Sequence, residues 1–134
     1  MKSSKAIFAS VILVTLFSVS AFAGNGAKVL AVVNRADWCP VCQKNGMRAM
    51  ETLKENNKDM SVRFVINDLT NDETKKQSSE ELKKLGLENV VKKYNATGVI
   101  HFFNPETKKE INEISVAKSN DELIGALETA KKGL

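Results

Sequence analysis

The sequence predicts an α/β fold in three layers, with a central mixed four-stranded sheet flanked by helices. An apolar, Val-rich run at residues 27–34 has the composition of a strand buried on both faces. An amphipathic helical pattern follows it, and a second apolar run at residues 61–67 comes after the helix. Two strands joined through a helix in this way usually pair in parallel. The later elements add a helical connection, a hairpin and a last helix.

The helix after the first strand begins at a pair of cysteines. Its apolar positions recur every three or four residues, with charged residues on the other side. These positions are Cys42, Gly46, Ala49, Met50 and Leu53. Met47 and Met50 are interpreted as core residues because they fall at helical spacing, and a polar run at residues 56–58 ends the helix.

The second half of the chain is less regular at first. Residues 71–81 hold almost no apolar side chain, so we expect a broken helical connection there without a core face of its own. The run 98–103 predicts the third strand, residues 104–107 a turn, and the run 111–116 the returning strand. A capping-box sequence at residues 119–122 predicts the start of the last helix.

The N-terminus has the three parts of a secretory signal peptide. Lys2 and Lys5 precede an apolar run at residues 6–17, and the small residues Ala21 and Ala23 follow. An uncleaved membrane anchor stays open as an alternative, because the apolar stretch reaches about 18 residues, the lower edge of what spans a bilayer. The pattern favours cleavage.

We therefore divide the chain into a signal peptide at residues 1–23 and a single compact domain at residues 24–134. Cleavage before Gly24 places that domain outside the cytoplasm, in the periplasm or the extracellular space. Two of the 20 basic residues lie in the signal peptide, which leaves 18 basic against 16 acidic residues. This small, interspersed charge does not favour nucleic acid as a partner, and we expect a monomer.

The two cysteines are separated by only two residues, in the run Trp38-Cys39-Pro40-Val41-Cys42. In an exported chain, two cysteines usually form a structural disulfide. A bridge across so short a loop restricts the unfolded chain less than a long-range bridge would. Stability is therefore a poor reason for this pair, and chemistry is a better one.

This run, placed where a buried strand passes into an amphipathic helix, resembles the active-site motif of the thioredoxin superfamily. The order of strands and helices across the whole predicted domain is also similar to that family. The resemblance implies a thiol-disulfide oxidoreductase that acts on protein thiols or disulfides with a redox partner protein. It implies that the protein needs no cofactor other than its own dithiol, and no metal. It also implies that Trp38 lies against the active-site surface.

The chemistry depends on the start of the helix, where unpaired N–H groups and the helix dipole favour a thiolate. Cys39 is predicted to ionise easily and to attack, because such thiols have pKa values of roughly 3.5 to 7.5. Pro40 suits the first helical position because it has no N–H to satisfy. Cys42 is expected to lie deeper and to resolve the mixed disulfide.

The sequence departs from the family at two positions. Val33 stands six residues before the first cysteine, where the family usually has a buried aspartate that accepts a proton from the second thiol. Ile100 is aligned with the cis-proline that usually lies opposite the pair, and we expect the bond before it to be trans. His101, the only histidine, follows directly.

Three functions remain open at this stage. The first is an extracytoplasmic oxidoreductase of protein disulfides. The second is a thioredoxin-fold metal-binding module, in which Cys39 and Cys42 bind copper or zinc with His101 as an optional third ligand. For His101 itself, a hydrogen-bonded structural role with the side chain pointing away from the sulfurs is favoured. The third is an adaptor with idle cysteines, which would leave the whole motif unexplained. The pattern favours the first.

Overall fold

The computed structural model describes residues 26–133, and the predicted signal peptide lies outside this range. Within residues 26–133, no helix is both long and apolar enough to cross a membrane. The predicted signal peptide, its cleavage and the export of the protein therefore stay predictions.

The sheet has four strands in the order β2-β1-β3-β4. β1 (Val29–Arg35) pairs in parallel with β2 (Val62–Asp68) on one side and antiparallel with β3 (Val99–Phe103) on the other, and β4 (Glu110–Ser115) pairs antiparallel with β3. The predicted mixed four-stranded sheet is thereby confirmed.

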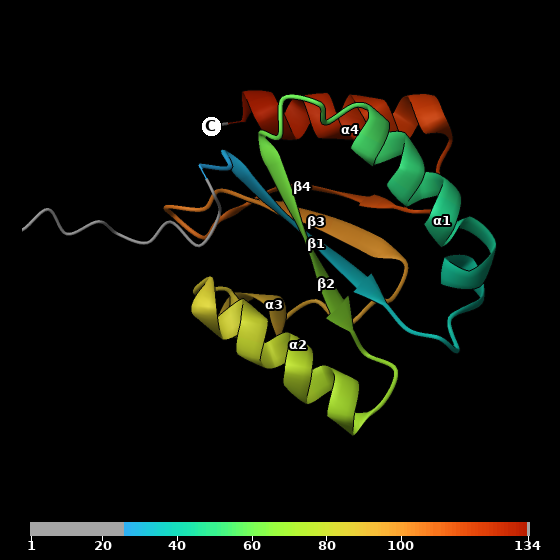
Figure 1. The fold of residues 1–134 in the computed structure, drawn as a ribbon, viewed down its shortest axis with the longest axis vertical. Coiled ribbons are helices and arrows are strands. Elements are labelled where there is room, and N and C mark those ends of the chain that lie inside the picture. The colour runs from blue at the N-terminus through green and yellow to red at the C-terminus, as the bar shows by residue number, and fades with distance from the viewer. Residues whose placement is uncertain (1–25, 134) are drawn as a thin grey trace, which may run out of the picture.

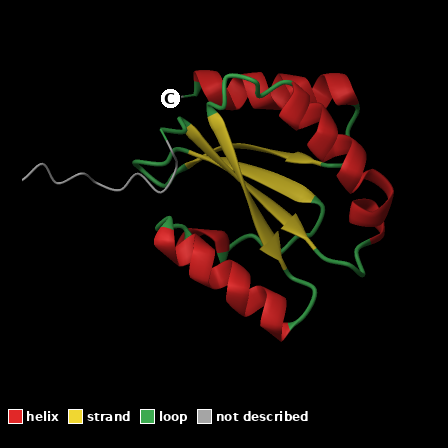
Figure 2. Cartoon of the chain, in the orientation of Figure 1, coloured by secondary structure: helices red, strands yellow, loops and turns green. Residues whose placement is uncertain are grey.

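Helices cover both faces of this sheet, as Figure 1 shows. α1 (Pro40–Glu55) and α4 (Asn120–Lys132) lie on one face, while α2 (Asp72–Lys84) and α3 (Glu88–Val91) lie on the other. Figure 2 shows the resulting three layers of helix, sheet and helix. The predicted three-layer α/β fold is confirmed.

β1 is central because it carries apolar side chains to both faces. Val29, Ala31 and Val33 belong to the core under α1 and α4, whereas Leu30 and Val32 belong to the core under α2 and α3. This explains the nearly continuous apolar run, because successive side chains of a strand point to opposite faces. The buried strand fixes where its following loop, which carries the cysteines, leaves the sheet.

The less regular segments also follow the predicted pattern. The connection is broken into α2 and α3, and α2 buries only Ser78 and Leu82. The last helix begins at the predicted capping box, in which the Ser119 side chain accepts from the Glu122 N–H while the Glu122 carboxylate accepts from the Ser119 N–H.

Candidate active site

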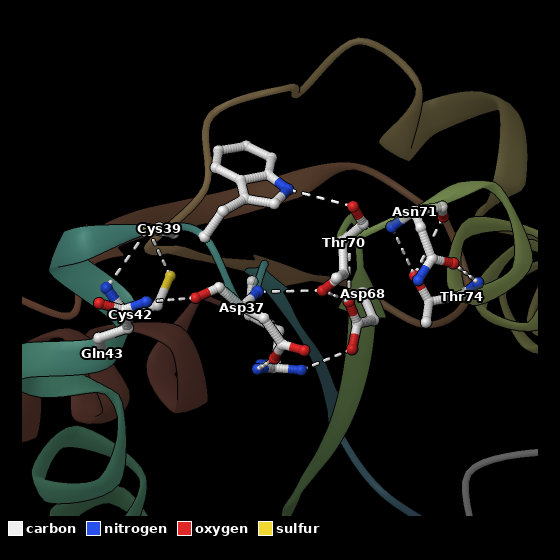
Figure 3. A network of polar contacts seen from close by, with 10 residues as sticks. Asp37, Cys39, Cys42, Gln43, Asp68, Thr70, Asn71 and Thr74 are labelled. Carbon is white, nitrogen blue, oxygen red and sulfur yellow. Dashed lines mark hydrogen bonds and ion pairs between the residues drawn. The ribbon is translucent and has the colours of Figure 1, made fainter.

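The two cysteines lie where β1 passes into α1. Cys39 is the N-cap of α1, and Pro40 is the first residue of the helix, as predicted. The Cys39 Sγ accepts a hydrogen bond from the Cys42 N–H at 3.3 Å, and the two Sγ atoms lie 2.7 Å apart as free thiols (Figure 3). The helix start therefore brings both sulfurs together at a point where backbone N–H groups favour a thiolate.

The two thiols differ in acidity. Burial raises the pKa of Cys39, but hydrogen bonds from the Cys42 thiol, the Thr97 side chain and the N–H groups of Cys42 and Val41 outweigh it, so the pKa is lower than usual. Burial and the hydrogen bond to Cys39 raise the pKa of Cys42. In the reduced pair, Cys39 is thus the thiol that loses its proton more easily, as expected for the predicted attacking thiol.

The more acidic of the two thiols is the less exposed one. Cys39 is only 3% exposed, whereas Cys42 is half-buried, so the expectation that Cys42 lies deeper is wrong. Residues Thr97 and Gly98, at the approach to β3, lie beside Cys39 and contribute to its cover. Acidity still favours Cys39 as the nucleophile, because the thiolate is the reactive form.

Gly98 lies against the pair, a contact that was not predicted, and the site-shaping role of Ile100 stays a prediction. A Cβ built on Gly98 would lie 3.7 Å from the Cys39 Sγ and 3.1 Å from a Val41 methyl carbon. Ile100 lies two residues further along β3, where it pairs with Val33 and is fully buried in the core under α1 and α4. Residues 26–133 contain no cis peptide bond, so the expected trans bond before Ile100 is confirmed.

The contacts of Thr97 and Gly98 with Cys39 were not predicted, although the sequence offers a signal for Gly98. A glycine immediately before an apolar run is a signal of a positive φ or of close backbone approach, and Gly98 has both, with φ of +78°. That signal was present in the sequence.

Trp38 lies beside the pair, and the loop after β2 fixes its orientation. Trp38 is 60% exposed, and its indole N–H donates to the Thr70 carbonyl oxygen at 3.1 Å. The Thr70 hydroxyl accepts from the Asp37 N–H at 3.0 Å, and the Gln43 side chain donates to the Asp37 carbonyl (Figure 3). Thr70 therefore links the segment before Cys39 to the end of β2, a role that the sequence did not indicate.

An ion-pair network also stabilises the loop between β1 and α1 that leads to Cys39. Arg35, the last residue of β1, contacts Asp37 and donates to the Asp68 carboxylate at 2.5 Å. Burial raises the pKa of Asp68, but hydrogen bonds from the Thr70 side chain and N–H, together with the charge of Arg35, hold it below its usual value. The network joins the ends of β1 and β2 beneath the active-site loop.

A pocket of about 290 Å³ opens beside Cys42. Val33, Met47, Met50 and Ile66 give it an apolar wall, and Arg35 is at its rim. Val33 and Cys42 thus line the same pocket, as expected from the sequence, and the Val33 side chain is apolar where the family usually has a carboxylate. Met50 packs against the core as predicted, whereas Met47 is 78% exposed, so its interpretation as a core residue is wrong.

His101 does not join the cysteines. Its ring faces Glu110 and Glu113, with Nδ1 2.6 Å and 3.1 Å from their carboxylates. In the described part of the chain, the single group of three residues placed to share a metal ion consists of these three and includes neither cysteine. His101 is therefore not a third ligand beside the cysteines, and its contacts agree with the favoured structural role.

The chain has a thioredoxin-like α/β fold, with two free cysteines side by side at the start of α1. No family model and no curated protein matches the chain. Among solved structures, it is similar to the crystal structure of Trxlp from Edwardsiella tarda EIB202, with a TM-score of 0.50 and 20% sequence identity over 81% of this chain and 88% of that chain. At this identity the likeness is one of fold, so the chemistry rests on the geometry of the cysteine pair.

Proposed function

We propose that this protein is an extracytoplasmic thiol-disulfide oxidoreductase that exchanges disulfides with protein clients through Cys39 and Cys42. The observation that supports this most directly is the opposite shift of the two thiol pKa values across a 2.7 Å contact. A pair of idle cysteines would need no such difference. The extracytoplasmic location follows from the signal-peptide pattern of residues 1–23.

The exchange proceeds in two steps. The Cys39 thiolate attacks one sulfur of a client disulfide, which forms a mixed disulfide and releases the other client sulfur as a thiolate. Cys42 then loses its proton and attacks the Cys39 sulfur, so the client leaves as a dithiol and the protein is left with a Cys39–Cys42 disulfide. The same steps in reverse oxidise a client dithiol, and a redox partner protein restores the starting state.

The proton of Cys42 needs an acceptor in the second step. Val33 cannot supply one, because its side chain is apolar. Cys42 is half-buried and lines the open pocket. Water in the pocket and the departing client thiolate can therefore accept its proton. Resolution is therefore expected to be slower than in a protein that has a carboxylate at this place.

Single-cysteine variants test the assignment. Cys42→Ser should accumulate a mixed disulfide through Cys39, whereas Cys39→Ser should form few adducts despite the greater exposure of Cys42. Mass spectrometry of adducts with a disulfide-containing peptide, followed by peptide mapping, measures both. Adducts carried mainly by Cys42 in the Cys39→Ser protein would show that exposure, and not acidity, decides which sulfur attacks.

Location is tested separately. Fractionation of cells that express the full chain should place the protein outside the cytoplasm, and its intact mass should correspond to a chain that begins at Gly24. A protein that keeps residues 1–23 and sediments with membranes would instead indicate the anchored alternative, without affecting the thiol assignment.

A further inference from the structure

His101 is a buried imidazole within β3. It is 3% exposed, and its ring lies on Tyr94 with the ring centroids 4.4 Å apart. Its Nε2 is buried without a hydrogen-bond partner, so the polar contacts of the ring are those made by Nδ1. Nδ1 points toward the carboxylates of Glu110 and Glu113 on β4.

A β-bulge brings the two glutamates to one face of the sheet. Residues three apart in a regular strand point to opposite faces, which would separate Glu110 from Glu113. Here His101 pairs with Glu113, but Phe103 pairs with Glu110, so Ile111 is an additional residue in β4. Since paired residues lie on the same face, the bulge aligns both carboxylates with the imidazole.

The three side chains converge at metal-binding distances. Their ligand atoms all lie within 4.8 Å of one another, and Nδ1 is 2.6 Å and 3.1 Å from the two carboxylate oxygens. Zinc bonds to nitrogen and oxygen of about 2.0 to 2.2 Å require ligand atoms roughly 3.3 Å apart. To reach that spacing from Nδ1, the Glu110 oxygen has to move outward by about 0.7 Å and the Glu113 oxygen by about 0.2 Å, and Glu113 is 58% exposed and has room to move.

Tyr94 contacts two members of this cluster. Its ring lies against that of His101, and its hydroxyl donates a hydrogen bond to Glu110. Two carboxylate oxygens and one imidazole nitrogen thus converge on one point, and Tyr94 helps to hold Glu110 there. A group that holds a ligating carboxylate in this way is typical of metal sites.

We propose that His101, Glu110 and Glu113 bind a divalent transition-metal cation, with zinc as the best match to one imidazole and two carboxylates. Water completes the coordination on the exposed side of Glu113. The cation would tie the edge strand β4 to β3 at the bulge. This site is separate from the dithiol and does not depend on the proposed oxidoreductase function.

Zinc titration of the untagged full chain tests the proposal, in a Cys39→Ser/Cys42→Ser background that removes the thiol ligands. Isothermal titration calorimetry should show one equivalent of zinc bound. Because the chain has a single histidine, the ¹⁵N resonances of its imidazole report the ligand directly, and Nδ1 should shift on binding. Glu113→Gln should weaken binding by about tenfold or more, while Glu80→Gln, an exposed glutamate on α2, should leave it unchanged.

Three results would overturn the proposal. They are the absence of saturable binding up to millimolar zinc, binding that leaves the imidazole nitrogens unshifted, and equal weakening by Glu113→Gln and Glu80→Gln. Binding without an imidazole shift would place zinc elsewhere on the surface. Glu113 is exposed, so Glu113→Gln should fold, and circular dichroism of each variant verifies this before titration.

Discussion

Gly98→Ala tests whether Gly98 controls the reactivity of Cys39. Gly98 has a φ of +78°, a conformation in which an L-residue costs roughly 1 to 2 kcal/mol. The new methyl group would also lie 3.1 Å from a Val41 methyl carbon, but Val41 is 38% exposed and can move away. The free energy of unfolding should therefore fall by about 1 to 2 kcal/mol, which leaves a folded protein for kinetic study.

The effect on chemistry comes from the second contact. The methyl carbon would lie 3.7 Å from the Cys39 Sγ, where it adds apolar cover without a clash. An added apolar group beside the sulfur disfavours its charged form, so the pKa of Cys39 should rise. A rise of half a pKa unit lowers the thiolate fraction, and hence the alkylation rate below that pKa, by about threefold.

Gly86→Ala is a matched control for backbone strain. Gly86 has a similar φ of +71°, and its added Cβ would meet only the flexible end of the Lys108 side chain. Both variants should lose similar stability, but only Gly98→Ala should slow the alkylation of Cys39 by iodoacetamide across a pH series. Equal alkylation rates in wild type, Gly98→Ala and Gly86→Ala would refute the placement of Gly98 over the sulfur.

Three further predictions concern the thiols and their support. Val33→Asp should speed resolution by Cys42 near neutral pH, because a carboxylate there can accept the thiol proton, and it should cost ~2 kcal/mol or more of stability; stopped-flow kinetics of a folded variant with an unchanged rate would contradict this. Asp68→Asn should destabilise the protein by ~1 kcal/mol and shift the fluorescence of Trp38, because the Asp68 carboxylate orients the loop that bonds the indole; unchanged emission would argue against that link. Because the pKa of Cys39 is lowered in the folded protein, the unfolded chain binds an extra proton at pH values between that pKa and the usual value of 9.0. The free energy of unfolding of the reduced protein should therefore rise with pH in this window, as measured by urea unfolding. The oxidised protein, which has no free thiol, should show no such rise.

The fold was predictable because its strong signals are local. The apolar run of β1, the capping box at Ser119 and the helical spacing after Cys39 each specify an element without reference to the rest of the chain. The strand order within the sheet follows from the parallel unit and the hairpin. α2, which buries only two side chains, is the element whose position the sequence could indicate least.

The candidate site was predictable only where the motif specifies it. The pair, its place at the helix start and the apolar Val33 beside it follow from the sequence. Thr97 and Gly98 contact Cys39 from a segment almost 60 residues away, and such contacts depend on the exact register between β1 and β3. Ile100, which the family alignment places opposite the pair, is buried in the core two residues beyond Gly98. The carboxylate neighbours of His101 were not predictable, because the bulge in β4 that brings them together has no clear sequence signal.

The two unusual features around Cys42 are physically connected. A fully buried thiol without a nearby carboxylate would have no acceptor for its proton, and its attack on Cys39 would require an unpaired charge in an apolar environment. In this protein an apolar Val33 stands in place of the carboxylate, and Cys42 is half-buried at a pocket that solvent can enter. Solvent access can thus replace the internal base, at the cost of a slower proton transfer than a positioned carboxylate gives. The inverted exposure of the two cysteines is therefore consistent with Cys39 as the attacking thiol, because Cys39 needs a stabilised negative charge and Cys42 needs a route for its proton.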